Sequence, residues 1–121
     1  MKYYEVKYNY DEDNIIYIKS NHQLNLVQNI IVPNHIKDHL IKSNVIGITY
    51  KPVILVNHDK KEILKNEWLI TSEITVSEIN IFCMEYDIVN IEVSEILAVS
   101  EKVKRIFEQN NYTMYKFKRI Y

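Results

Sequence analysis

The sequence has little glycine and little cysteine, and each shortage excludes a kind of chemistry. Its 121 residues include one glycine, Gly47, and one cysteine, Cys83. Gly-rich phosphate loops and the turn that presents a nucleophilic serine need more glycines than this, so both kinds of site are excluded. A disulfide within the chain is excluded as well. Because Cys83 lies in an apolar run, we expect a buried thiol in a reducing compartment.

The sequence also lacks long apolar runs. No run approaches the roughly 18 residues that a membrane-spanning helix requires, and the first residues do not have the pattern of a secretory signal peptide. We therefore expect a cytoplasmic protein with no membrane partner. The hydrophobic fraction of 47% and the charged fraction of 26% are typical of a globular protein, and the length fits one domain spanning residues 1–121.

The sequence is rich in isoleucine and tyrosine, which favour strands. Residues 2–8 and 15–19 mix apolar or aromatic side chains with polar ones in a half-buried strand pattern, which predicts a hairpin. Residues 53–56 and 63–64 flank a polar segment and predict either a second hairpin or a strand and a turn. Residues 72–93 alternate over most of their length, and we expect two or three strands there.

Two helices are expected among these strands. Pro33 suits the first turn of a helix over residues 33–43, which ends at Asn44 because asparagine tolerates the left-handed conformation. Ser100 is a good N-cap for a second helix, which ends at the asparagine pair 110–111 before a last strand. The sequence therefore predicts an α+β fold, mainly an antiparallel sheet with two short helices.

A helix-then-strand pattern occurs twice in the sequence. Residues 30–53 can be laid on residues 97–120 with a constant shift of 67 positions. Most apolar positions then coincide, and Asn44 meets Asn111 at the two helix ends. This overlay is compatible with an internal helix–strand repeat, and equally with two segments that share only a common patterning.

The histidines are the first candidates for a metal or catalytic site. His35 and His39 lie four positions apart, a spacing that places two imidazoles on one helix face, as in helical zinc sites. The segment lacks the glutamate of such sites and has no cysteine nearby, so we expect a histidine pair at the edge of the core. His22 and His58 lie in polar turns without a nucleophile. We predict no catalytic residue, no cofactor and no metal.

The end of the chain interleaves basic and aromatic residues, a composition that binds single-stranded nucleic acid in some proteins. Strand alternation, however, places Tyr115 and Phe117 on the face opposite Lys116 and Lys118. A stacking platform and a basic groove should converge on one face. We therefore do not expect a nucleic-acid partner.

Charge is distributed unevenly along the chain. Residues 62–101 carry nine acidic side chains and one basic, whereas residues 102–121 carry six basic and one acidic. This pattern indicates either a polarised surface that steers a charged partner or the solvated face of alternating strands. The candidates for partner contact are the six acidic residues Glu73, Glu78, Glu85, Asp87, Glu92 and Glu95.

One segment suggests a family. It reads Ile96-Leu97-Ala98-Val99-Ser100-Glu101-Lys102-Val103-Lys104. This segment resembles the strand, V-S-E-x-[LV]-K helix and final strand that close small bacterial immunity proteins of polymorphic and contact-dependent toxin systems. The resemblance covers about residues 79–121, with a weaker echo at 30–56.

The resemblance implies a protein that binds and neutralises a cognate protein toxin, and it implies no catalytic residues. If the toxin is a nuclease, its basic substrate cleft would attract the acidic block. The alternative is a small non-catalytic binding domain for another protein or for nucleic acid.

Overall fold

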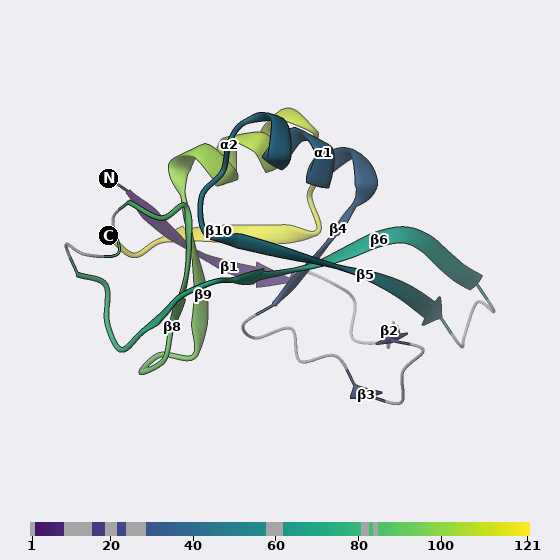
Figure 1. Ribbon diagram of the computed structural model, residues 1–121, viewed down its shortest axis with the longest axis horizontal. Coiled ribbons are helices and arrows are strands. Elements are labelled where there is room, and N and C mark those ends of the chain that lie inside the picture. Colours follow the sequence, from purple (N-terminus) through teal and green to yellow (C-terminus); the bar gives the residue numbers. More distant parts are fainter. Residues whose placement is uncertain are drawn as a thin grey trace.

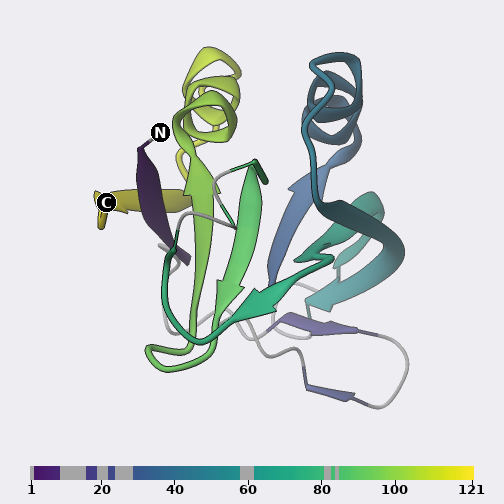
Figure 2. The ribbon, with the colours of Figure 1, turned by 60° about the vertical axis from the view of Figure 1, so that its left-hand side comes forward.

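The computed structural model describes residues 2–8, 16–18, 22–23, 29–57, 62–80, 83 and 85–121. Within these residues it confirms the α+β class, with two helices and two five-stranded, mostly antiparallel sheets (Figure 1). The helices are α1 (Asn34–Lys42) and α2 (Glu101–Gln109). They lie next to each other on one side of the two sheets (Figures 1 and 2).

We name the sheets A and B. In sheet A the strands follow the order β10 (Tyr115–Arg119), β1 (Tyr3–Tyr8), β9 (Ile96–Ser100), β8 (Ile88–Ile91), β7 (Thr75–Val76). In sheet B the order is β3 (His22–Gln23), β2 (Ile16–Ile18), β5 (Ile48–Asn57), β6 (Glu62–Ser72), β4 (Ile30–Pro33). The pair β7–β8 is parallel, and every other neighbouring pair is antiparallel.

The expected hairpin of the first two strands is wrong. β1 pairs with β9 and β10 in sheet A, whereas β2 pairs with β3 and β5 in sheet B. β1 buries side chains on both faces, Val6 toward the helices and Tyr3 on the other side. Because its backbone N–H and C=O groups are then shielded from water, they need a hydrogen-bonded strand on each flank. Only chain segments distant in the sequence supply those flanks. The second expected hairpin is confirmed as β5 and β6, with an irregularity between Val53 and Leu55.

The two segments matched in the sequence fold alike. α1 and α2 begin and end 67 positions apart, and so do the starts of β5 and β10. The residues that precede the helices have nearly the same backbone angles, φ −72° and ψ 167° at Pro33 and φ −70° and ψ 164° at Ser100. Both helices are followed by an asparagine in the left-handed region, Asn44 at φ 54° and Asn111 at φ 52°. The asparagine stops predicted from the sequence are confirmed.

The correspondence extends to a strand that the sequence overlay did not contain. In each half, an antiparallel strand separates the two parallel ones: β6 between β4 and β5, and β1 between β9 and β10. Lys37 Nζ lies 3.8 Å from the ring centroid of Trp68 in β6. Lys104 Nζ, 67 positions later, lies 5.0 Å from that of Tyr4 in β1. Each half is thus a strand–helix–strand–strand unit. In the second half the first three elements are β9, α2 and β10, and the fourth, β1, comes from the start of the chain.

The main core lies between the helices and the two sheets. It joins Val6 of sheet A and Ile70 of sheet B with the inner faces of both helices. Phe107 of α2 is fully buried at its centre and meets three aromatic rings edge-on, at centroid distances of 5.6 to 6.0 Å: Tyr112, Tyr115 and Phe117. The Tyr115 hydroxyl accepts from Ile31 N at 2.6 Å and donates to Ile31 O at 3.2 Å. This tyrosine therefore ties β10 of sheet A to the outer edge of β4 in sheet B.

A second apolar cluster lies on the outer face of sheet A, away from the helices. It contains Tyr3 and Cys83, and the expectation of a buried thiol is confirmed. The Tyr3 hydroxyl lies 2.7 Å from the carbonyl oxygen of Cys83 and 2.6 Å from that of Tyr86. Burial raises the pKa of Tyr3 above its ordinary value. Ile79, Cys83 and Tyr86, from the segment between β7 and β8, pack in this cluster, and its members Ile79, Ile91, Ile96 and Ile120 also line the candidate site.

Candidate interaction surface

The six acidic candidates all lie beside β7 and β8, at one edge of sheet A. Five of them are exposed: Glu73, Glu78, Glu85, Glu92 and Glu95. None of the ion pairs between described residues involves any of these five. Because β7 runs parallel to β8, Glu73 and Glu85 lie near the starts of the two strands, and Glu78 and Glu92 lie near their ends. The edge therefore carries exposed carboxylates at both of its ends.

Backbone hydrogen bonds hold the end of this edge together. Glu92 N donates to Val76 O at 2.8 Å, and Val93 N donates to Ser77 O at 3.3 Å. Glu95 closes the turn after β8 with φ 53°, and its amide donates to Glu92 O at 3.2 Å. These bonds fix the backbone positions of Glu78, Glu92 and Glu95, while the side chains extend into solvent.

Asp87 does not belong to this exposed set, because it is 7% exposed. Its Oδ1 accepts from Ser100 Oγ at 2.7 Å, and its Oδ2 accepts from Ile46 N at 2.8 Å. The Ser100 hydroxyl in turn accepts from Val103 N and caps α2, as the sequence predicts. Asp87 thus joins the start of α2 to the turn that follows α1, and its carboxylate stabilises the fold.

The only glycine is required at this junction. Gly47 has φ 93°, in the left-handed region, and a Cβ atom on it would lie 2.9 Å from Tyr86 Cδ1. The residue 67 positions later is Met114, whose side chain is exposed. Gly47 therefore serves the packing of the segment before β8 against the turn after α1.

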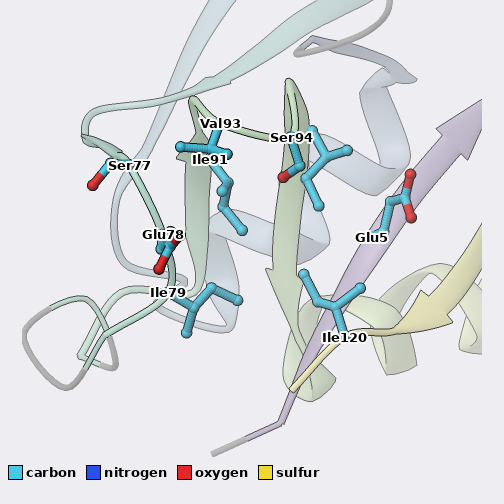
Figure 3. A pocket seen from close by; sticks show the side chains of 9 residues that line it. Glu5, Ser77, Glu78, Ile79, Ile91, Val93, Ser94 and Ile120 are labelled. Carbon is cyan, nitrogen blue, oxygen red and sulfur yellow. The ribbon is translucent and has the colours of Figure 1, made fainter.

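A shallow apolar groove of about 510 Å³ lies on the outer face of sheet A (Figure 3). Four isoleucines, two from strands β8 and β9 and two from segments that follow strands, contribute to its apolar lining: Ile79, Ile91, Ile96 and Ile120. Glu78 and Glu5 lie on opposite sides of the groove (Figure 3). Val93, at one end, is 69% exposed, the most exposed large apolar side chain among the described residues. The groove thus places apolar surface directly beside carboxylates.

The other end of the same face is basic. Lys7 and Lys116 lie opposite each other in the β1–β10 pair, and Glu5 lies opposite Lys118. Lys7 Nζ also lies 3.6 Å from Glu5 Oε1. Across the outer face of sheet A, charge therefore changes from positive on β10 to negative beside β7 and β8, with the groove between them.

The histidine pair of α1 does not form a metal site in the described part of the chain. His35 is exposed, whereas the half-buried His39 places Nδ1 2.8 Å from Asn110 Nδ2. Among the described residues, no three His, Cys, Asp or Glu side chains gather as metal ligands would. Only the backbone of His22 is described, in β3, and His58 lies outside the described residues.

The aromatic residues of β10 face the core. Tyr115 is buried, and Phe117 packs edge-on against Phe107 at 5.7 Å. Lys116 and Lys118 are exposed on the other face. The opposite orientation of aromatic and basic side chains expected from the sequence is therefore observed, so the rings and the lysines do not converge on one face.

Sequence analysis identified Glu78, Glu92 and Glu95 but missed the groove beside them. Glu5 and Ile120 come from the two ends of the chain, and nothing in their local sequence places them near Ile79. One signal was present: Val93 is an apolar residue within the polar run 92–95, a position where a turn leaves side chains exposed.

Comparison of the chain with models of protein families, with curated proteins and with solved structures gave no match. Neither α1 nor α2, the helices within the described residues, is long enough and apolar enough to cross a bilayer.

Proposed function

We propose that this protein binds and neutralises a cognate protein toxin, in the manner of a small bacterial immunity protein. The observation that carries the proposal is the row of five exposed carboxylates along one edge of sheet A, next to an open apolar groove. Protein interfaces combine a central apolar contact with a polar rim, and this surface offers both. The segment 96–104 supports the same proposal through its resemblance to that family.

Neutralisation by this surface is steric. A toxin that acts on nucleic acid has a basic substrate cleft, and the acidic edge would compete with the substrate for it. Five like charges on one edge raise the association rate, because they steer a basic partner over a distance of about 8 to 10 Å at moderate salt. The proposal therefore includes association that slows as ionic strength rises.

The position of the surface on paired strands favours tight binding. Ile91 and Ile96 lie opposite each other in the paired strands β8 and β9, and Glu5 belongs to β1, which pairs with β9 and β10. Side chains on such a scaffold lose little additional freedom when a partner binds, so less of the interaction energy is spent on ordering.

The second candidate is a non-catalytic domain that binds a protein other than a toxin. The same acidic edge and groove favour it equally, and the two candidates differ only in the partner. A nucleic-acid partner is less well supported, since the aromatic rings of β10 are packed in the core.

The test is co-expression of this protein with the toxin candidate encoded next to its gene, with growth as the readout. We expect growth inhibition to be relieved and the two chains to co-purify. The variant Glu78→Lys/Glu92→Lys should slow association at low salt on the order of tenfold. The matched control Asp38→Lys/Glu108→Lys makes the same change in net charge on the exposed surface of the helices and should leave the rate within about twofold. The proposal is contradicted if neither the wild-type protein nor any of the variants relieves the growth inhibition.

A further inference from the structure

We infer that the groove on the outer face of sheet A is the docking site for one segment of the partner protein, whose apolar side chains enter the groove and whose lysines or arginines lie on the side of Glu78. The inference rests on the proposed function for the identity of the partner, but the chemistry of the segment follows from the groove itself. Three observations support it: the apolar lining, the carboxylates beside it that have no cationic partner among the described residues, and the lysines that bound it.

The lining of the groove requires an apolar occupant. Ile79 and Ile96 line the groove and are half-buried, Ile91 is 5% exposed, and Val93 adds an apolar side chain that is 69% exposed. The three isoleucines belong to the apolar cluster around Tyr3, and its half-buried members, together with Val93, keep part of their aliphatic surface in contact with solvent. Aliphatic groups from a partner would remove this surface from water.

The charges beside the groove determine what flanks that apolar occupant. Glu78 lines the groove, and Glu92 and Glu95 stand in the turn next to Val93. Among the described residues none of these three carboxylates has a cationic partner, while Glu5 on the other side is offset by Lys7 at 3.6 Å. A segment with lysines or arginines next to its apolar residues would be complementary to the side that holds Glu78.

The basic strand fixes the orientation of the segment. Lys7, Lys116 and Lys118 lie on the same face of sheet A, beyond Glu5 and Ile120. A basic residue of the partner placed on that side would meet like charge, which disfavours binding. The segment therefore lies with its positive end toward Glu78 and the turn 92–95.

The first experiment measures binding of defined peptides to the isotope-labelled full-length protein by NMR. The probe is a short peptide whose leucines have lysines on one side only, compared with one that has glutamates in place of the lysines and one that has serines in place of the leucines. We expect the lysine–leucine peptide to shift the backbone amides of residues 77–79 and 91–96. Equal binding of all three peptides, or shifts only outside the groove, would overturn the inference.

Two matched pairs of variants separate the groove from the rest of the surface. Val93→Ser should weaken binding of the lysine–leucine peptide about tenfold, whereas Ile41→Ser, at another exposed aliphatic position, on α1, should change it less than twofold. Glu78→Gln should weaken it about fivefold, whereas Glu73→Gln, at the other end of the acidic edge, should have a smaller effect. All four side chains are exposed or nearly so, and the unfolding midpoint should not change. Loss of binding in the Ile41 or Glu73 variants to the same extent would overturn the inference.

A second arm uses the toxin and distinguishes this inference from the proposed function. If Val93→Ser and Glu78→Gln lose neutralisation while their controls keep it, both stand. If neutralisation is intact in all four variants, the function stands and the groove is not the docking site. If the lysine–leucine peptide binds the groove but no toxin is neutralised, the docking site stands and the toxin is not the partner.

Discussion

Replacement of Asp87 by alanine should destabilise the protein by about 3 kcal/mol. The carboxylate accepts two short hydrogen bonds, from Ser100 Oγ at 2.7 Å and from Ile46 N at 2.8 Å. A hydrogen bond to a charged group contributes roughly 1.5 to 3 kcal/mol, and the lower figure applies where neighbours can relax toward water. Loss of both bonds leaves the Ile46 amide without this acceptor in a partly buried turn, so we take the lower figure for each.

The contribution of the hydrogen bond that Ser100 donates to Asp87 can be measured separately. Ser100→Ala removes the same hydrogen bond to Asp87 and also the cap of α2, each contributing about 1 to 1.5 kcal/mol, so we expect a loss of about 2.5 kcal/mol. The double variant Asp87→Ala/Ser100→Ala loses the shared bond only once. Its destabilisation should therefore be smaller than the sum of the single effects by about 1.5 kcal/mol.

The assay is urea unfolding of the four proteins of this cycle, followed by circular dichroism, with the slope of the transition compared between them. Glu85→Ala is the control, because Glu85 is exposed two positions away and its loss should lie within about 0.5 kcal/mol of zero. A stable Asp87→Ala protein, or a coupling energy near zero, would refute the reasoning. Asp87 would then have to be returned to the set of partner-contact candidates.

Three further predictions concern the fold. Burial raises the pKa of Glu67, so its carboxyl group stays protonated to higher pH in the folded protein than in the unfolded chain. The free energy of unfolding, compared with that of Glu67→Gln in paired urea titrations, should therefore fall as pH rises through and above 4.5. Phe107→Ala should lower the free energy of unfolding, measured by thermal or urea denaturation, by about 3 to 5 kcal/mol, because the ring is fully buried among three other aromatic rings. Lys37→Met should lower the free energy of unfolding by up to about 1 kcal/mol, because it removes the cation–π contact with Trp68 at 3.8 Å. A double-mutant cycle with Trp68→Leu should give a larger coupling energy than the cycle of Lys104→Met with Tyr4→Leu, since Lys104 lies 5.0 Å from the Tyr4 ring.

Local features of the sequence predict the helices well. Pro33 and Ser100 mark the starts of α1 and α2, and Asn44 and Asn111 mark their ends, because capping depends on a few neighbouring residues. The predicted helix from 33 to 43 differs from the observed Asn34–Lys42 by one residue at each end. The α+β class follows from the same local signals.

Strand pairing depends on contacts that sequence patterns do not contain. The alternation in β1 indicates a strand but not its neighbours, which come from the last quarter of the chain. The candidate site shows the same division. Charge identifies Glu78 and Glu92, whereas the burial of Asp87 depends on its distance from Ser100 and Ile46, and the groove depends on the approach of Glu5 to residues 77–79.

The repeated unit explains why the site lies where it does. One copy comprises β4, α1, β5 and β6, residues 30–72, and the other comprises β9, α2 and β10, residues 96–119, completed by β1. The segment 73–95 between the copies belongs to neither, yet it contains all six acidic candidates, β7 and β8. Asp87 attaches the segment to both copies through its hydrogen bonds with Ile46 and Ser100. Tyr86 of the segment packs so close to Gly47 of the first copy that this position has no room for a side chain. The exposed residues of the segment have no counterpart in the repeated architecture, so the fold leaves them free to vary with the partner. Changes in charge at Glu78, Glu92 and Glu95 should therefore alter binding while leaving the free energy of unfolding within about 0.5 kcal/mol of the wild-type value. Substitutions at equivalent buried positions of the two copies that do not line the groove, Leu40 and Phe107, should alter stability and leave binding by the folded protein unchanged.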